Sequence, residues 1–296
     1  MNKYKIYLSK EQYTEATVKS YDIQAEKFRE WLLLTGLECN LFDYKQAIQY
    51  VHYLQQKHEN PKTINHKLTA IKHYFNYLIH IGEQAQNPFT GLKVQGEKKN
   101  RLLHNLLSQD ELEDLYYSYE TEKDKHPRRI LINKRNKVMV GLMVYQGLNT
   151  SDMKRLKLEH LELYKGEIYI PKGKIGNRRT LSLRAWQVME FISYINEVRP
   201  KLLPKNNTEI TNVFIASKDR LTDTVSWIIK KLKKINHKVI NTHQIRASVI
   251  VHWLSKHHLR KVQILAGHKY ISTTERYIQE NLKQLQEVVN NYHPIS

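Results

Sequence analysis

The sequence predicts a mainly α-helical protein with a small β-hairpin or sheet, divided into a helical bundle over residues 1–98 and a larger mixed domain over residues 99–296. Three observations support this division. Apolar residues recur at three- and four-residue spacing over much of the chain, as on the buried face of a helix. Two short strand-like stretches flank a glycine-containing hairpin. Pro88 and Gly91 precede a basic cluster that ends near residue 101, which is typical of a linker between domains.

The first segment carries three apolar stripes, each typical of one buried face of a helix. The stripes are Val18, Tyr21, Ala25, Phe28 and Leu32; Tyr44, Ala47, Ile48, Val51 and Leu54; and Ile64, Leu68, Ile71, Phe75 and Leu78. Gly36 can end the first helix and Asp43 can cap the second. The third is expected to begin at Pro61 and to end at Gly82.

The second segment begins with a capping box at Ser108–Glu111, so a helix is expected to start there. Residues 138–145 are almost all apolar, which favours a buried helix ended by Gly147. Residues 167–170 and 180–183 resemble two short strands. The hairpin between them carries four cations, which are Lys172, Lys174, Arg178 and Arg179.

Helical patterns resume near Arg184, Thr222 and Thr242. After Ile278 the chain predicts a short amphipathic tail helix, over about residues 279–292, with Leu282, Leu285, Val288 and Val289 on its apolar face. This helix could dock on a neighbouring subunit or fold back on its own domain.

The charge is large and unevenly placed. Lys and Arg number 48 against 29 Asp and Glu, a net charge of +19. Residues 1–98 carry only +3 of it, and residues 99–296 carry +16. Such a surplus indicates a polyanionic partner, and nucleic acid is the first candidate. Lys62, Lys67 and Lys72 accompany the third helix and fit either phosphate contact or an ordinary solvated face.

Several classes of protein are excluded by composition. No run of about 18 apolar residues is present to span a membrane. The first residues lack the apolar stretch of a signal peptide. Cys39 is the only cysteine, which excludes a disulfide framework and a thiolate zinc site. We therefore expect a cytoplasmic protein, associated with the nucleoid if its partner is DNA.

The strongest motifs lie near the C-terminus. His243 and Arg246 are three residues apart, on one face of a helix. Gly267 and His268 follow, and Tyr277 comes nine residues after that histidine, across a Ser-Thr-Thr cluster. This order of motifs, together with the basic hairpin and the preceding bundle, resembles the tyrosine recombinase family, also called the phage integrase family. The resemblance spans nearly the whole chain.

The resemblance implies phosphoryl transfer through covalent catalysis on duplex DNA. Tyr277 matches the nucleophile, which leaves a 3′-phosphotyrosyl link and a free 5′-hydroxyl. Arg246 matches a bidentate phosphate clamp, and His243 and His268 match two histidines that donate to the phosphate. Lys174 matches the hairpin lysine that protonates the leaving 5′-oxygen, with Lys172 as the alternative because hairpin registers are easily misread.

The resemblance also implies an N-terminal core-binding domain, a tetramer on DNA, and neither metal nor cofactor. A type IB topoisomerase and a DNA-binding protein without catalysis remain alternatives, and so does RNA binding on charge alone. A recombinase of a bacterium, an archaeon or a mobile element would fit. Integration, excision, transposition, inversion and dimer resolution are not distinguished.

One position departs from the family pattern. The first catalytic arginine normally follows Gly-Leu at the end of the apolar helix, but Asn149 stands there, with the expected acid present at Asp152. A neutral amide cannot grip two phosphate oxygens as a guanidinium does. Three explanations follow: another cation replaces the arginine, the enzyme is slow, or cleavage is lost and binding kept. The candidate replacements are Arg155, Arg178 and Arg179.

Overall fold

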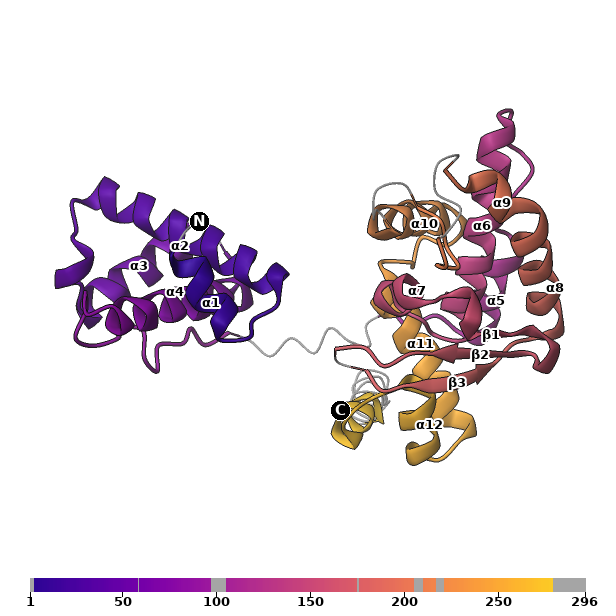
Figure 1. The fold of residues 1–296 in the computed structure, drawn as a ribbon. Helices are drawn as coiled ribbons and strands as arrows, with labels where there is room; N and C mark the ends of the chain where they lie inside the picture. The colour runs from indigo at the N-terminus through magenta and orange to yellow at the C-terminus, as the bar shows by residue number, and fades with distance from the viewer. Residues whose placement is uncertain are drawn as a thin grey trace, which may run out of the picture. The chain divides into compact units, whose positions relative to one another are not determined.

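The computed structural model describes residues 3–57, 59–96, 105–174, 176–204, 210–216 and 221–278. Contacts divide the chain into two units, Met1–Lys99 and Asn100–Ser296 (Figure 1). Each unit has its own hydrophobic core. The predicted tail helix, and the end of the predicted linker, lie outside the described residues.

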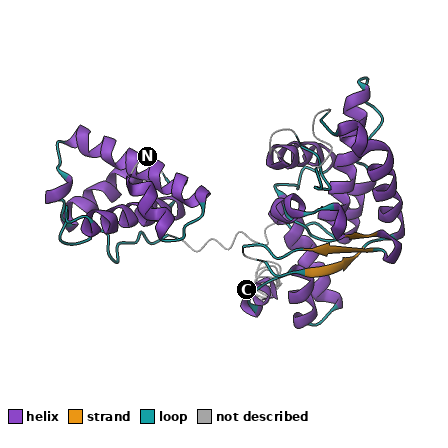
Figure 2. Cartoon of the chain, viewed as in Figure 1, coloured by secondary structure: helices purple, strands orange, loops and turns teal. Residues whose placement is uncertain are grey.

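In the described part of the first unit, all regular secondary structure is helical, and loops join the helices (Figure 2). Its elements are α1 (Lys3–Lys10), α2 (Glu15–Thr35), the 3-10 helix η1 (Cys39–Leu41), α3 (Tyr44–Gln56) and α4 (Pro61–His80). The three predicted helices are confirmed. Gly36 ends α2 in the left-handed region with φ +67°, and Asp43 caps α3 through a reciprocal capping box with Gln46.

Aromatic rings fill the centre of this unit. Phe28 contacts the rings of Phe42, Tyr50, Phe75 and Phe89, with centroids 4.9–5.8 Å apart. These rings come from five separate segments, so burying them joins α2, the turn after η1, α3, α4 and the segment after α4 into one bundle. Helix α1 was not predicted, because only Tyr4 and Leu8 of its eight residues are buried.

The second unit surrounds the long helix α6 (Pro127–Val144). The elements that flank it are α5 (Gln109–Tyr117), α7 (Thr150–Arg155), η2 (Leu158–His160), β1 (Leu161–Glu162), η3 (Leu163–Lys165), β2 (Glu167–Ile170) and β3 (Arg179–Ser182). They are followed by α8 (Ala185–Ser193), the π-helical η4 (Tyr194–Val198), α9 (Arg199–Leu202), α10 (Leu221–Ile235), α11 (Thr242–Lys256) and α12 (Leu259–Ala266). Residues 271–278 are also helical.

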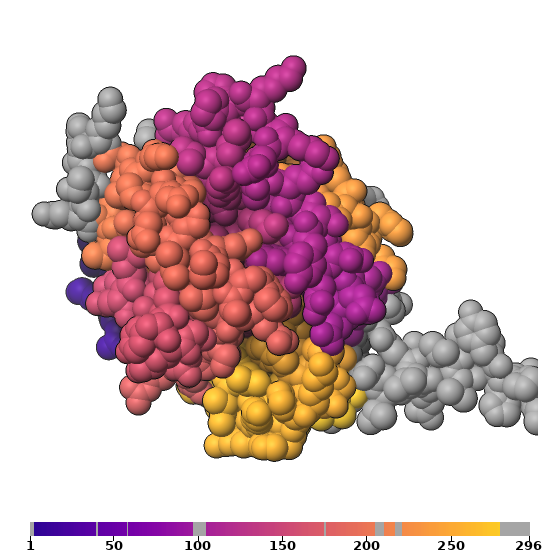
Figure 3. Space-filling view, turned by 90° about the vertical axis from the view of Figure 1, so that its right-hand side faces the viewer, coloured from indigo at the N-terminus to yellow at the C-terminus, as the bar shows by residue number. Residues whose placement is uncertain are grey.

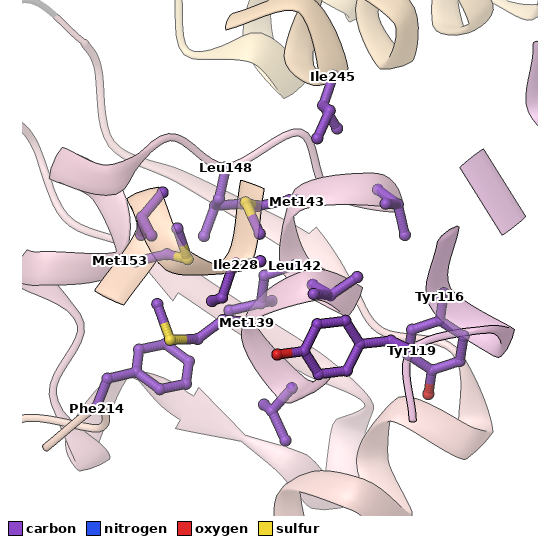
Figure 4. Close-up of a cluster of buried hydrophobic side chains, with 14 of the residues drawn as sticks. Tyr116, Tyr119, Met139, Leu142, Met143, Leu148, Met153, Phe214, Ile228 and Ile245 are labelled. Carbon is purple, nitrogen blue, oxygen red and sulfur yellow. The ribbon is translucent and has the colours of Figure 1, made fainter. Parts of the chain in front are cut away.

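The core of this unit lies around α6. Met139, Leu142 and Met143 from that helix pack with Ile228 of α10 and Ile245 of α11, among other buried side chains (Figure 4). The predicted buried helix is therefore confirmed, although it begins at Pro127 and ends at Val144, before Gly147. In the space-filling view the yellow segment, which holds α12, lies below the magenta segment that holds α5 and α6 (Figure 3). Helix α11 packs on both α5 and α6.

The sheet is antiparallel and has the order β1-β2-β3 among the described residues. Ile168 of β2 pairs with Leu161 on one side and with Leu181 on the other. Burial alternates along β2 and β3, as expected for strands with one buried face. Strand β3 begins at Arg179, one residue before the predicted start, and β1 was not predicted. Strand β3 packs against α12 (Figure 1), which brings the hairpin next to the C-terminal motifs.

A search of the described residues found no helix with the length and apolar character needed to cross a bilayer.

Candidate active site

A buried carboxylate, Asp152 in the first turn of α7, gathers three arginines. Its Oδ1 accepts a hydrogen bond from Arg155 at 2.7 Å, and its Oδ2 accepts one from Arg179 at 2.8 Å. Nη1 of Arg246 lies 3.9 Å from the same Oδ2, beyond hydrogen-bond distance. Three guanidinium groups around one carboxylate leave a surplus of positive charge, which favours an anion such as a phosphate.

Backbone carbonyls hold Arg246 in place. Its Nη1 donates to the carbonyl of Gly147 at 2.6 Å, and its Nη2 donates to the carbonyl of Ala266. Gly147 has φ +58°, and a Cβ there would lie 3.3 Å from Val249. Glycine therefore lets the turn after α6 approach α11 closely. The guanidinium is fixed in position while its charge stays out of hydrogen-bond distance of Asp152.

His268 and Tyr277 lie side by side. Their rings are nearly parallel, with centroids 5.9 Å apart and planes 12° from each other. Nδ1 of His268 lies 2.8 Å from Oγ1 of Thr274, which is fully buried one turn before Tyr277. Gly267, with φ +69°, ends α12 and turns the chain toward this pair. The Thr274 hydroxyl thus fixes the imidazole against the ring of the predicted nucleophile.

The imidazole of His268 is neutral at pH 7, mainly because it is buried. Burial, with further contributions from Arg246 and Arg179, lowers the pKa of His268 to about 4. Burial and Arg179 also lower the pKa of Arg246, whereas Asp152 and Tyr277 raise it. A neutral imidazole donates through one nitrogen only. If the Thr274 hydroxyl donates to Nδ1, then Nε2 carries the proton and can donate to an anion.

The hairpin tip is tied to this cluster. The Asn177 N–H donates to the carbonyl of Gly267 at 2.9 Å, and Gly176 pairs with His268 in an isolated antiparallel bridge. The N–H of Gly173 donates to the Gly176 carbonyl at 2.9 Å and closes the turn. These bonds place the predicted cationic hairpin beside the C-terminal motifs.

The two candidate hairpin lysines are both exposed. Lys172 and Lys174 flank Gly173, whose added Cβ would lie 2.6 Å from Nη2 of Arg155. Lys172 also lines an open hollow of about 610 Å³ with Tyr169, Asn177 and Arg178. Both lysines therefore stay predictions, at the edge of the arginine cluster.

Asn149, which stands where the family pattern has its first catalytic arginine, caps a helix. Its Oδ1 accepts a hydrogen bond from the N–H of Asp152 at 2.8 Å, which makes it the N-cap of α7. Of the candidate replacements, Arg155 and Arg179 bind Asp152, whereas Arg178 is exposed. Asn149 thus supports the helix whose first turn holds the carboxylate.

The remaining predicted residues are not drawn into the cluster. His243 is exposed in the first turn of α11, one turn before Arg246. In the first unit Lys62 is exposed and Lys72 is half-buried. Lys67 forms an ion pair with Glu59 in which both side chains are largely buried. The Lys67 charge is therefore neutralised within the bundle.

Thr274 is a site residue that the motifs did not single out. Its only sequence signal is its place in the Ser-Thr-Thr cluster between His268 and Tyr277. We expect Thr274→Val to slow DNA cleavage about tenfold, since the imidazole loses the bond that fixes its tautomer, and to destabilise the fold by about 1–3 kcal/mol. Single-turnover cleavage and thermal unfolding measure the two effects. Thr273→Val is the matched control, and equal effects of both substitutions would contradict the assignment.

The low pKa of His268 also predicts a pH effect on stability. The unfolded histidine binds its proton near pH 6.5, whereas the folded one binds it near pH 4. Between these values the unfolded state holds more protons, so the free energy of unfolding decreases as pH falls from about 6.5 to about 4. Denaturant unfolding across this range is expected to show a shallower decrease in His268→Gln. An unchanged slope in that variant would contradict the assigned environment.

Comparisons with known proteins identify the family of the chain. The model of the phage integrase family matches residues 105–284, and the model of the phage integrase N-terminal SAM-like domain matches residues 1–82. Tyrosine recombinase XerC of Staphylococcus saprophyticus is 26% identical over 287 residues, covering 96% of this chain and 93% of the relative. XerC of Staphylococcus aureus is 26% identical over 286 residues, covering 95% and 92%.

Two solved structures share the fold. The XerH site-specific recombinase bound to a palindromic difH substrate has a TM-score of 0.67 at 18% identity, covering 92% of this chain and 78% of that one. A λ integrase dimer bound to a core site has a TM-score of 0.64 at 13% identity, covering 93% of each chain. With both family models matched and the site motifs gathered in one unit, the chain belongs to the phage integrase family of tyrosine recombinases.

Proposed function

We propose that this chain is an active site-specific recombinase that cuts and rejoins duplex DNA through a 3′-phosphotyrosyl link at Tyr277. The observation that carries the proposal is the gathering of Arg246, His268 and Tyr277 in one cluster with excess positive charge. The net charge of +19 supports a DNA partner, as do the names of the similar XerH and λ integrase complexes.

The chemistry is a pair of transesterifications. The Tyr277 phenol oxygen bonds to the scissile phosphorus, the bond from phosphorus to the 5′-oxygen breaks, and a hairpin lysine protonates the leaving oxygen. A 5′-hydroxyl of the partner strand later attacks the phosphotyrosine and releases the phenol. Arg246 and His268 stabilise the charge that develops on the phosphate. Because the phosphotyrosyl bond replaces the phosphodiester that was cut, the proposed reaction needs no ATP. The cationic and hydrogen-bonding side chains around the phosphate take the place that a metal ion would have in stabilising its charge.

The proposed assembly is a tetramer formed by pairing two sites that each hold two subunits. The same transesterifications serve an integrase-like or transposase-like enzyme and a resolving one. DNA affinity is expected to fall steeply with salt, because the cationic side chains displace counterions from the phosphates.

Covalent trapping tests the proposal. A site is first selected from a random duplex pool by binding, and nicked duplexes carrying it are then incubated with the full chain in EDTA without ATP. We expect an adduct that resists denaturation and maps to Tyr277. Tight binding without any adduct would contradict an active enzyme.

A catalytically impaired DNA-binding relative is the second candidate. The observation that favours it is the use of Asn149 as a helix cap, which leaves no arginine at that position. An adduct that forms only in Asn149→Arg would support this alternative, and an adduct in the wild type would exclude it.

A further inference from the structure

We propose that Arg179 is a positioning residue that neutralises Asp152 and thereby keeps the charge of Arg246 available to a DNA phosphate, at a site that lacks an arginine at position 149. The inference rests on the proposed function. It assigns to a residue on strand β3, within the hairpin, the task of neutralising the carboxylate that lies beside Arg246.

Arg179 is built into the site. Its side chain is 2% exposed and its Nη2 donates to Oδ2 of Asp152 at 2.8 Å. A Cβ on Gly267 would lie 2.5 Å from its Nη1 and 3.0 Å from its Cδ, so the guanidinium occupies the space that glycine leaves open. A buried guanidinium without a partner is costly in free energy. Breaking the ion pair between Arg179 and Asp152 is therefore strongly unfavourable.

Arg179 is more deeply buried than the other two candidate arginines, Arg155 and Arg178. The Arg155 side chain is 32% exposed and binds the other carboxylate oxygen, Oδ1. Arg178 is exposed. Water and salt screen exposed charges, whereas a buried charge acts on its neighbours at a lower effective dielectric constant. Arg179 also shares Oδ2 of Asp152 with Arg246.

The distances from Oδ2 of Asp152 to its two neighbouring arginines indicate what Arg179 does. Arg179 is hydrogen-bonded to this oxygen, whereas Nη1 of Arg246 stays 3.9 Å away and bonds to the Gly147 carbonyl instead. Without Arg179, Arg155 would still pair with Oδ1 of Asp152, but Oδ2 would lose its hydrogen-bonded arginine and would face Arg246 at 3.9 Å. Arg246 would then be drawn to the carboxylate, and a phosphate would have to compete with Asp152 for it.

The decisive experiment compares cleavage rates under single-turnover conditions on the trapped nicked duplex. We expect Arg179→Met to slow cleavage about 10²-fold, the usual effect of losing one preorganised charge. Arg179→Lys should keep most of the rate, because it retains the charge. Asp152→Asn added to Arg179→Met should restore about tenfold or more, since it removes the carboxylate that competes for Arg246.

A matched control separates positioning from folding. Arg135 is another buried arginine of the same unit, bonded to the Ile215 carbonyl and to Asn136. Arg135→Met should lower the unfolding temperature without slowing cleavage by the folded protein. Cleavage by Arg179→Met within about threefold of the wild-type rate would overturn the inference, and so would a double variant no faster than Arg179→Met.

A titration tests the charge arrangement without relying on cleavage. The groups around the His268 ring are Arg246 from α11, Arg179 from β3, and Thr274 and Tyr277 from the helical stretch 271–278. By NMR, the pKa of His268 should rise in Arg179→Met, and an unchanged value would overturn the inference. A wild type that forms no adduct would instead contradict the proposed function, and the titration would still decide the placement of Arg179.

Discussion

Tyr277→Phe is expected to abolish the covalent protein–DNA adduct while leaving DNA affinity within about twofold of wild type. The substitution removes the phenol oxygen, which is the proposed nucleophile, and keeps the ring whose centroid lies 5.9 Å from that of His268. The phosphate contacts and the hairpin are unaltered. Loss of a nucleophile in a covalent mechanism lowers the rate by roughly 10⁴-fold or more.

The measurement is gel analysis of denatured mixtures with end-labelled nicked duplex, beside a binding titration of the same samples. Tyr270→Phe is the matched control, because Tyr270 lies seven residues earlier and is 62% exposed. An adduct of normal yield in Tyr277→Phe would show that another residue attacks the phosphate. Loss of the adduct in both variants would point to a general effect on this segment.

Arg246→Lys has the second-largest expected effect, a decrease in cleavage rate of about 10²–10³-fold. The guanidinium binds the carbonyls of Gly147 and Ala266 at once and still presents N–H groups elsewhere. A lysine ammonium is a single point of charge and cannot span the two carbonyls and hold two phosphate oxygens. Arg246→Lys therefore keeps the positive charge and loses the planar arrangement of N–H donors.

Arg199→Lys provides the control for loss of a carbonyl-spanning arginine. Arg199 binds the carbonyls of Ile210 and Asn212, within the same unit but with no bond to the site residues among the described contacts. We expect Arg199→Lys to lower the unfolding temperature and to leave the rate of single-turnover cleavage unchanged. A rate for Arg246→Lys equal to that of Arg199→Lys would contradict the clamp assigned to Arg246.

Local signals in the sequence predicted much of the fold. Ser108 forms the predicted capping box with Glu111, because this motif involves only four consecutive positions. Asp43 caps α3 as predicted, and the reciprocal bond from Gln46 comes in addition. Strand β2 has its predicted bounds. Strand β1 is only two residues long, which is too short for an alternating pattern to be visible.

The sequence motifs predicted which residues form the candidate site. They did not predict the hydrogen bonds and ion pairs that these residues form with one another. The pairing of Asp152 with Arg179 joins residues 27 apart in sequence, and no local pattern distinguishes Arg179 from Arg178. Arg179 is the first residue of β3 and lies on its buried face, whereas Arg178 precedes the strand and is exposed. Asn149 could be identified as an absent arginine, but its role as the N-cap depends on where α7 begins, which was not predicted.

The two carbonyls that grip Arg246 have a consequence during synthesis of the chain. They belong to Gly147 and Ala266, 99 residues before and 20 residues after the arginine. Contacts that span so much sequence carry a large loop-closure entropy and form slowly. A growing chain that ends between Arg246 and Ala266 lacks one of the two carbonyls, and it also lacks Tyr277. The candidate site can therefore be complete only after synthesis has passed Tyr277.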